Sequence, residues 1–436
     1  MEKFDLVVKG KFVVSFSDGV IENGAVGIKG NKIDRVFREG EFGYHADEII
    51  GGDDLIVMPG LVNTHTHAAM IAFRGLADDL PLFEWLQNYI WPAEGKFVTE
   101  EFIRKTLPVA ASEMISTGTT LFADMYFFQQ DAAEVLRKIG MRAVLAEGII
   151  SFPTPTAESW EKQLQYNEEF IKNWLNDELI KPSIGPHAPY TTTPEILKKV
   201  RDVAEKYGVP IQIHVAETRR EVQEVREKFG KTPVRYLDSI GFLNSSVVSA
   251  HSVWLDDEEI DIYVEKNVGI ASCPQSNAKL ASGVAPHRKY LEKGAKLALG
   301  TDGDASNNSL DMFQEMKFMA LICKVNTLDP TSCPANEVLK SATLRGAISL
   351  GYSNLGDIKE GFLADLITLK INKPHSIPVF NPISHIVYAA KGTDVNDVVI
   401  NGKPVYRNRE FLTLDFHRSI REFNIIINKI KDEFKI

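Results

Sequence analysis

The chain has 436 residues, of which 44% are hydrophobic and 25% charged, and these proportions are typical of globular rather than disordered or collagen-like proteins. Its formal net charge is -10, and its basic runs are short and interrupted, which argues against binding to a nucleic-acid polymer. No segment has the length and apolar character of a membrane span or a signal peptide. Cys273, Cys323 and Cys333 are irregularly spaced, so we expect neither a disulfide framework nor a thiolate zinc site. We therefore expect a cytoplasmic protein in a reducing compartment.

Residues 1–58 alternate short β-branched runs with turn signals. The turns are predicted at Asp18-Gly19, Asn23-Gly24 and Gly30-Asn31. Asn-Gly between alternating runs favours a hairpin, so this segment predicts a small antiparallel sheet. The segment is too short to form a complete sandwich by itself.

From Pro59 the pattern changes to apolar runs of strand length separated by amphipathic stretches of helix length. This alternation is typical of βα units on a parallel sheet. Predicted helices begin after the capping residues Thr99, Thr193 and Asp256. Eight such units are what a closed (β/α)8 barrel of the TIM type requires. The eight predicted strands are 55–64, 119–124, 142–149, 183–186, 210–215, 246–250, 269–272 and 296–301.

After about residue 350 the strand and turn signals return, with predicted strands at 364–369, 386–388, 397–400 and 405–406 and a hairpin turn at Asn401-Gly402. Half-sheets at opposite ends of the chain can pair with each other. We therefore predict an α/β protein in three parts. They are a discontinuous β-sandwich domain from residues 1–58 and 351–415, a barrel from residues 59–350 and a C-terminal helix from residues 416–436.

The strongest local signal is Thr64-His65-Thr66-His67 at the end of the first predicted barrel strand. Positions i and i+2 of a strand share a face, so both imidazoles can bind one ion, although the pair alone could also be two unrelated histidines. Side chains at the carboxyl ends of barrel strands converge on one face. Imidazoles with one carboxylate predict a mononuclear site for a borderline-soft divalent metal. The other candidates at strand ends are His187, His214, His251 and Asp302.

Four ordered segments resemble the amidohydrolase superfamily: 59–67, 214–218, 249–251 and 300–308. The resemblance extends over nearly the whole chain. Within that superfamily the chain is most similar to the branch of 5'-methylthioadenosine and S-adenosylhomocysteine deaminases, a similarity sharpened by residues 74–94.

The resemblance implies a ligand set for one divalent ion per subunit, with zinc expected and iron as the alternative. Dinuclear relatives carry a bridging lysine after the fourth strand, where this chain has His187, so one ion is expected. The implied ligands are His65, His67, His214 and Asp302.

The resemblance also implies the catalytic roles. Glu217 would shuttle a proton to ring N1, His251 would steer the metal-activated water, and Asp302 would take the proton of that water. Read without the resemblance, Glu217 could be an acidic residue at a helix N-terminus.

Four residues are implied to contact the substrate. Glu94 would bind the ribose hydroxyls, His187 and Ser306 would contact the purine or ribose, and Trp85 would form a wall near the 5' substituent. The structural alternatives are that Glu94 is a solvated loop residue and Trp85 a core aromatic residue.

The implied reaction is hydrolytic deamination of the adenine ring of 5'-modified adenosines, which yields the inosine analogue and ammonia. Residues 146–158, after the third predicted strand, contain no Lys or Arg to bind a carboxylate, and we expect Glu94 and Glu147 at an acidic pocket rim. Uncharged substrates such as 5'-methylthioadenosine, 5'-deoxyadenosine and adenosine should therefore be preferred to S-adenosylhomocysteine.

Two other interpretations remain open. One is an aminohydrolase or halohydrolase of the same superfamily that acts on guanine, cytosine or s-triazine rings, and the other is a catalytically silent scaffold. Retention of the implied ligands and of Glu217 argues against the scaffold. We also expect a homo-oligomer, either a dimer or a tetramer, and a packed rather than nucleophilic Cys273. The remaining histidines are expected at the surface: His45, His287, His375, His385 and His417.

Overall fold

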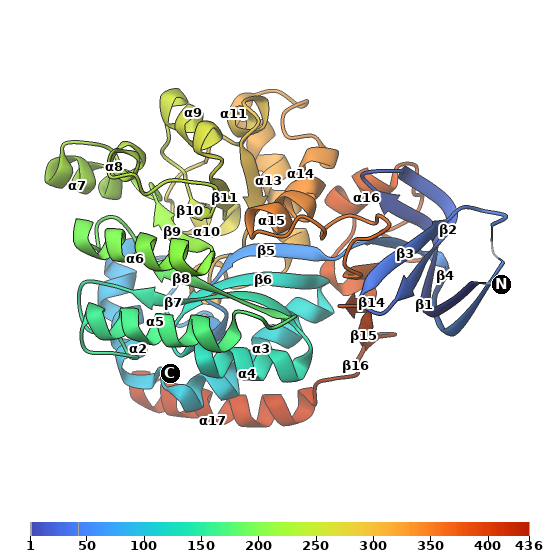
Figure 1. The fold of residues 1–436 in the computed structure, drawn as a ribbon, viewed down its shortest axis with the longest axis horizontal. Coiled ribbons are helices and arrows are strands. Elements are labelled where there is room, and N and C mark those ends of the chain that lie inside the picture. Colours follow the sequence, from blue (N-terminus) through green and yellow to red (C-terminus); the bar gives the residue numbers. More distant parts are fainter. Residues whose placement is uncertain (1, 42, 436) are drawn as a thin grey trace.

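Two eight-stranded sheets organise the chain, one parallel and one mixed (Figure 1). The structure is a computed structural model that describes residues 2–41 and 43–435. The first strands of the chain lie beside its last strands at one end of the molecule, and the parallel sheet with its helices occupies the rest (Figure 1).

The parallel sheet follows the order of the sequence from β5 to β12, which confirms the predicted barrel. Its strands are buried along nearly their whole length, as expected when helices cover a parallel sheet. The strands are β5 (Leu61–Thr66), β6 (Thr119–Tyr126), β7 (Arg142–Ile149), β8 (Ile180–Pro186), β9 (Ile211–Val215), β10 (Val247–His251), β11 (Gly269–Ser272) and β12 (Lys296–Leu299).

Hydrogen bonds between β5 and the residues after β12 close the barrel. Asn63 Nδ2 donates to Thr301 Oγ1 at 2.7 Å, and the Thr301 N–H donates to Asn63 Oδ1 at 3.0 Å. The Asp302 N–H donates to the His65 carbonyl oxygen at 3.0 Å. A Cβ atom on Gly300 would lie 2.8 Å from His65 N, so this close approach requires glycine. The seam therefore places Asp302 beside His65.

The predicted first strand, 55–64, is wrong because it combines two strands. β4 (Tyr44–Pro59) belongs to the mixed sheet, whereas β5 begins the barrel after Gly60. A Cβ atom on Gly60 would lie 2.1 Å from Thr120 Oγ1, so the chain changes sheets at a residue without a side chain. Both halves of the apolar run are buried, which is why the sequence does not reveal the change.

The mixed sheet joins the two ends of the chain, as predicted. β4 pairs with β1 in parallel and with β13 antiparallel, so it lies between the N-terminal and C-terminal strands. This topology supports the predicted three-part division, whose exact boundaries stay a prediction. In sheet order the strands are β16 (Glu410–Phe411), β15 (Lys403–Arg407), β14 (Val395–Ile400), β13 (Leu366–Lys370), β4, β1 (Glu2–Ser15), β2 (Gly19–Lys29) and β3 (Lys32–Phe37).

Two local predictions in the mixed sheet are wrong. Asn23-Gly24 lies inside β2 rather than in a turn, and Gly24 pairs with Gly10 of β1. Residues 386–388 belong to helix α16 (Pro382–Tyr388), whose first turn is capped by the Asn381 side chain. The predicted turn at Asn401-Gly402 is confirmed, with φ angles of 53° and 76°.

Helices cover the barrel, and the predicted caps are confirmed. The side chains of Thr99, Thr193 and Asp256 each accept a backbone N–H from the first turn of their helix, which stabilises a helix by about 1 kcal/mol. The long helices are α3 (Glu100–Ser116), α4 (Gln129–Ile139), α5 (Trp160–Trp174), α6 (Pro194–Tyr207), α7 (Arg219–Phe229), α9 (Asp257–Lys266), α13 (Met312–Thr327) and α17 (Phe416–Phe434).

Shorter helices connect these elements, and α17, the predicted C-terminal helix, packs outside the barrel against α3 (Figure 1). Among the described residues, none of the helices combines the length and apolar character that crossing a bilayer requires. The shorter helices are η1 (Ala68–Phe73), α1 (Leu82–Trp85), the π-helix η2 (Leu86–Ile90), α2 (Trp91–Phe97), α8 (Pro233–Ser239), α10 (Pro274–Lys279), α11 (His287–Glu292), α12 (Asp304–Asn307), α14 (Ala335–Ser341), α15 (Leu344–Ser349) and η3 (Gly392–Asp394).

Two of the three cysteines form a disulfide, which their irregular spacing did not predict. Cys323 near the end of α13 forms a disulfide with Cys333, with a Cα–Cα distance of 6.3 Å. The chain reverses after α13 through Leu328, whose φ is 51°, and this reversal brings Cys333 back to the helix. Cys273 is free and buried, as expected for a packed thiol.

The histidines expected at the surface divide into two groups. His287 and His385 are buried, so their prediction is wrong. His287 lies at the start of α11 against Ser272, at 2.9 Å from its hydroxyl, a contact between segments that spacing does not reveal. His45, His375 and His417 are exposed, as predicted.

A buried ion pair fastens the barrel to the mixed sheet. Arg142 at the start of β7 donates from Nε to Asp365 Oδ2 at 2.8 Å, and from its terminal nitrogen to Oδ1 at 3.0 Å. Both side chains are only 1% exposed. Arg142 also donates to the Glu178 carbonyl oxygen, just before β8, and to Asn401 Oδ1, in the turn after β14.

We predict that Arg142→Ala lowers the free energy of unfolding by about 3–5 kcal/mol, because it leaves the Asp365 carboxylate buried without its partner. Urea unfolding followed by circular dichroism measures the change. Arg418→Ala is the matched control, because Arg418 forms a solvent-exposed pair with Glu422 whose loss should change the stability little. Equal losses in the two variants would contradict the assignment.

Candidate functional site

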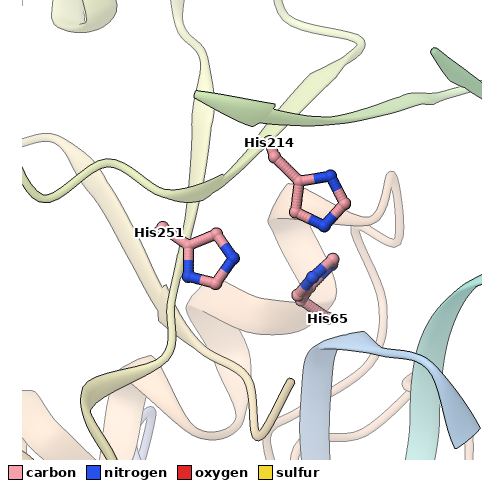
Figure 2. Close-up of side chains that lie close together, drawn as sticks. All are labelled: His65, His214 and His251. Atoms are coloured by element: carbon pink, nitrogen blue, oxygen red, sulfur yellow. The ribbon is translucent and has the colours of Figure 1, made fainter. Parts of the chain in front are cut away.

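The residues predicted to bind a metal meet at the carboxyl ends of the barrel strands. His65 lies on β5 and His67 directly follows it, His214 lies on β9, and Asp302 follows β12. His251, which was predicted to steer the water, lies beside them at the end of β10. The rings of His65, His214 and His251 point toward one another (Figure 2). The nitrogen atoms of these three, and separately the ligand atoms of His65, His67 and Asp302, lie within 4.8 Å of one another.

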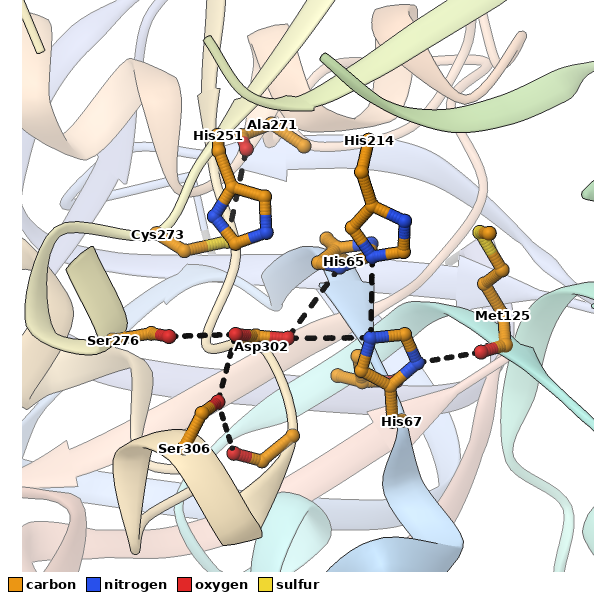
Figure 3. A network of polar contacts seen from close by, with 12 residues as sticks. His65, His67, Met125, His214, His251, Ala271, Cys273, Ser276, Asp302 and Ser306 are labelled. Atoms are coloured by element: carbon orange, nitrogen blue, oxygen red, sulfur yellow. Dashed lines mark hydrogen bonds and ion pairs between the residues drawn. The ribbon is translucent and has the colours of Figure 1, made fainter. Parts of the chain in front are cut away.

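Backbone carbonyl groups fix the orientation of two of the imidazoles. Nδ1 of His67 lies 2.5 Å from the Met125 carbonyl oxygen (Figure 3). Nδ1 of His214 lies 2.7 Å from the His187 carbonyl oxygen. Because a carbonyl can only accept, each Nδ1 carries the proton and each Nε2 keeps its lone pair. The two Nε2 atoms lie 3.3 Å apart. This is the tautomer that binds a metal through Nε2.

His65 and Asp302 complete the cluster. His65 Nε2 is buried without a hydrogen-bond partner, and it lies 3.5 Å from Asp302 Oδ1. His67 Nε2 lies 3.3 Å from the same oxygen. Burial lowers the pKa of His65 to about 4, so its ring is neutral at pH 7. An unpaired buried nitrogen, further free lone pairs and a carboxylate oxygen fit a divalent cation.

Two serine hydroxyls orient the Asp302 carboxylate. Ser276 Oγ and Ser306 Oγ donate to Oδ2 at 2.6 and 2.7 Å, which leaves Oδ1 directed at His65 and His67 (Figure 3). Burial opposes ionisation, but the neighbouring histidines hold the pKa of Asp302 well below its usual range. Asp302 has a φ of 63°, so the backbone is turned out of the strand to present this carboxylate.

Glu217 and His251 lie side by side next to this cluster. Glu217 Oε2 is 3.8 Å from His251 Nε2, and Ser282 donates to Glu217 Oε1 at 3.1 Å. His251 Nδ1 donates to Asn277 Oδ1 at 2.9 Å, which directs Nε2 toward Glu217. Burial raises the pKa of Glu217, so the carboxyl group can carry a proton closer to neutral pH than an exposed glutamate does.

A cavity of about 370 Å³ opens above the cluster. Every predicted substrate-contacting residue lines it, namely Trp85, Glu94, His187 and Ser306. Among its described lining residues there is no Lys or Arg. The predicted residues are therefore brought together at one cavity, although contact with a substrate stays a prediction.

Aromatic residues that sequence reasoning missed also line the cavity, including Tyr126, Phe152 and Tyr190. Tyr126 is the last residue of β6, so its position at a strand end was the available signal. Burial raises the pKa of Glu94 to about 7, and Tyr126 opposes that shift.

One expectation about the cavity is corrected, and one part of the segment 74–94 lies away from it. Glu147 does not lie at the rim but is buried, where it accepts hydrogen bonds from Thr156 Oγ1 at 2.5 Å and the Gln129 N–H at 3.0 Å. Arg74, in the segment 74–94 that sharpens the resemblance, does not line the cavity but donates to Asp304 Oδ1 at 3.0 Å. It thus fastens the loop after Asp302, and only the later part of that segment lines the cavity.

We predict that the purified protein binds one divalent ion per chain and that His65→Ala abolishes this binding, because it removes the most buried free nitrogen of the cluster. Ser306→Ala should weaken metal affinity by about 10–100-fold through loss of the hydrogen bond to Asp302. Inductively coupled plasma mass spectrometry and competition with a chelator measure these changes. His417→Ala, at an exposed position, is the control and should retain the ion. Retention of the ion by His65→Ala would refute the site.

Comparisons with known proteins agree with this geometry. A sequence profile described as the amidohydrolase family matches residues 56–405. A 5-methylthioadenosine/S-adenosylhomocysteine deaminase of Thermodesulfovibrio yellowstonii is 43% identical over 94% of this chain and 95% of its own length. A 5'-deoxyadenosine deaminase of Methanosarcina barkeri is 44% identical, with 94% and 95% covered. The crystal structure of an adenosine deaminase from Xanthomonas campestris with bound zinc superposes with a TM-score of 0.97 at 35% identity, covering 99% of each chain. The chain belongs to the amidohydrolase family.

Proposed function

We propose that this protein deaminates the adenine ring of 5'-modified adenosines by hydrolysis, releasing the inosine analogue and ammonia. The observation that carries the proposal is the shared cavity, which places Glu217 and the His/Asp cluster at the base of largely apolar walls. Relatives that align over almost the whole chain carry the names of deaminases of 5'-modified adenosines, which supports this class of substrate.

We propose that His65, His67, His214 and Asp302 hold one divalent ion, with zinc expected and iron as the alternative. Bound zinc in the Xanthomonas adenosine deaminase structure supports that choice. Such an ion, when bound, would lower the pKa of water in the site from about 15.7 towards about 7 and would so supply the nucleophile at neutral pH.

The side chains around the cluster would move the protons. Glu217, in its protonated form, donates to N1 of the adenine ring so that the ring accepts electrons when water attacks C6. His251, held by Asn277, orients the attacking water through Nε2. Asp302 accepts the proton of that water and helps to deliver it to the departing ammonia.

The remaining predicted residues would bind the nucleoside. Ionised Glu94 offers two acceptor oxygens to the ribose hydroxyls. His187 and Ser306 would contact the purine or ribose, and Trp85 would pack against the 5' substituent, since all of them line the same cavity.

We predict that 5'-methylthioadenosine, 5'-deoxyadenosine and adenosine are deaminated. The kcat/KM for 5'-methylthioadenosine should exceed that for S-adenosylhomocysteine by about tenfold or more, because the described cavity walls offer no cation to a buried carboxylate. The absorbance change from adenine to hypoxanthine, with ammonia release, measures turnover. Glu217→Gln should lower kcat by about 10²–10⁴-fold, the contribution of a general acid.

Three outcomes would contradict these assignments. Turnover of free guanine, cytosine or chlorotriazines without turnover of nucleosides would favour another reaction of the family. The absence of turnover in a metal-loaded protein would favour a silent scaffold. A higher kcat/KM for S-adenosylhomocysteine than for 5'-methylthioadenosine would refute the argument that the cavity walls lack a cation for the carboxylate.

The pH dependence of KM provides a test of Glu94. Its pKa of about 7 means that the carboxyl group loses one acceptor as the pH falls through that value. We therefore predict that KM for adenosine rises between about pH 8 and about pH 6. Glu94→Gln should have a higher KM that is independent of pH over this range, whereas Glu84→Gln, at an exposed position of α1, should behave as the unmodified protein. A rising KM that persists in Glu94→Gln would assign the titration to another group.

We also infer that the protein assembles as a homo-oligomer, a dimer or a tetramer, in the cytoplasm. Leu328 and Phe380 are 90% and 93% exposed, and subunit contacts at these positions would remove their apolar side chains from water.

A further inference from the structure

Glu221 is a buried carboxylate that the proposed reaction does not use. It lies in the first turn of α7, four residues after Glu217, and is 2% exposed. Its Oε1 accepts the Ala216 N–H at 2.8 Å, and its Oε2 accepts the Glu217 N–H at 2.7 Å. Both carboxylate oxygens therefore bind the backbone from which the Glu217 side chain projects.

The same backbone turn is held from the opposite side. Ala216 has a φ of 53°, a conformation that alanine rarely adopts without support. Its carbonyl oxygen accepts the N–H groups of Val253 and Trp254, both at 3.0 Å. Hydrogen bonds on both sides thus maintain a strained turn immediately before Glu217.

Helix α9 provides a comparison, because it also has a glutamate as its third residue, and there the glutamate forms a regular capping box. Glu259 in the first turn of α9 accepts the N–H of its own N-cap residue, Asp256, at 2.9 Å. In α7 the N-cap is Thr218, and Glu221 reaches past it to the two preceding residues. The Glu221 carboxylate therefore secures the strand-to-helix turn, whereas the Glu259 carboxylate caps its helix.

We propose that Glu221 is a positioning residue that fixes the backbone at Glu217, so that the Glu217 carboxyl group faces His251 at the base of the cavity. This inference rests on the proposed function, because it concerns the proton that Glu217 transfers. A displacement of a reacting group by about 1 Å can lower the rate by about 10²-fold. Loss of the two hydrogen bonds from Glu221 would let the backbone at Glu217 shift, and a shift of this size would be enough to lower turnover.

Kinetics of matched variants test the proposal. Glu221→Gln keeps one acceptor but places an amide N–H₂ group against a backbone N–H, and Glu221→Asp keeps the charge but is too short to bind both N–H groups. Each should lower kcat for 5'-methylthioadenosine by about 10–100-fold, with KM within about threefold and the metal content unchanged. Glu259→Gln, also at a 2% exposed position in a first helical turn, should leave kcat unchanged. A kcat of the Glu221 variants within twofold of the unmodified protein would overturn the proposal.

A double-mutant cycle separates positioning from a general loss of structure. If Glu221 acts through Glu217, then Glu221→Gln introduced into the Glu217→Gln background should lower the residual kcat by less than about twofold. If Glu221→Gln lowers kcat by the same factor of about 10–100 whether residue 217 is Glu or Gln, Glu221 does not act through Glu217 and the proposal is refuted.

Amide hydrogen exchange gives a readout that does not depend on the substrate. The Ala216 and Glu217 amides should be protected in the unmodified protein and in Glu259→Gln, and should exchange faster in Glu221→Gln and Glu221→Asp. Unchanged protection would overturn the proposal even if the protein deaminates adenosines. Lost protection in a protein without deaminase activity would instead show that the proposed function fails while the contact is real.

Discussion

The closure of the barrel between β5 and the end of β12 is the constraint on which the site depends. Strands that are far apart in the sequence become neighbours there, and the Asp302 N–H binds the His65 carbonyl oxygen. Gly300 permits the close approach, and Asn63 with Thr301 supplies hydrogen bonds that a regular ladder would otherwise make. A carboxylate and an imidazole from opposite ends of the barrel sequence are thereby placed at fixed positions before any ion binds.

Burial then determines the protonation of the cluster. Desolvation lowers the pKa of His65 and of His214, which keeps these rings neutral, and raises that of Glu217. Asp302 differs because its histidine neighbours outweigh its desolvation. Two carboxyl groups in one cavity thus have pKa values shifted in opposite directions, an arrangement suited to an ionised acceptor beside a protonated donor.

The sequence predicts the barrel because the alternation of apolar strand-length runs and amphipathic helix-length runs is a local pattern. It predicts the site residues because those residues stand directly at the ends of the runs. Parallel strands end on a common face, so histidines at strand ends converge whatever the details of the connecting helices. His65, His214 and Asp302 were therefore predictable from their positions alone. The resemblance to a known family added roles for Glu94 and Trp85, which have no periodic signal of their own.

The features that the sequence did not predict depend on contacts between distant segments. Nothing in the run 55–64 marks Gly60 as the point where the chain changes sheets, because both sides are equally apolar. The pairing of Cys323 with Cys333 depends on a reversal after α13, and the burial of Glu147 depends on Thr156 in a loop that folds back over it. Such contacts follow from the packed structure and not from the composition of either partner.

The position of β4 in the mixed sheet also has a consequence for biosynthesis. β4 is completed at residue 59, but its partner β13 begins only at Leu366, so about 300 residues of barrel separate the two strands in the order of translation. Until then the edge of β4 that β13 will cover lacks its native partner. Long-range pairing of this kind folds slowly and leaves strand edges exposed to aggregation, so the N-terminal strands lack this partner until about the last sixth of the chain is synthesised.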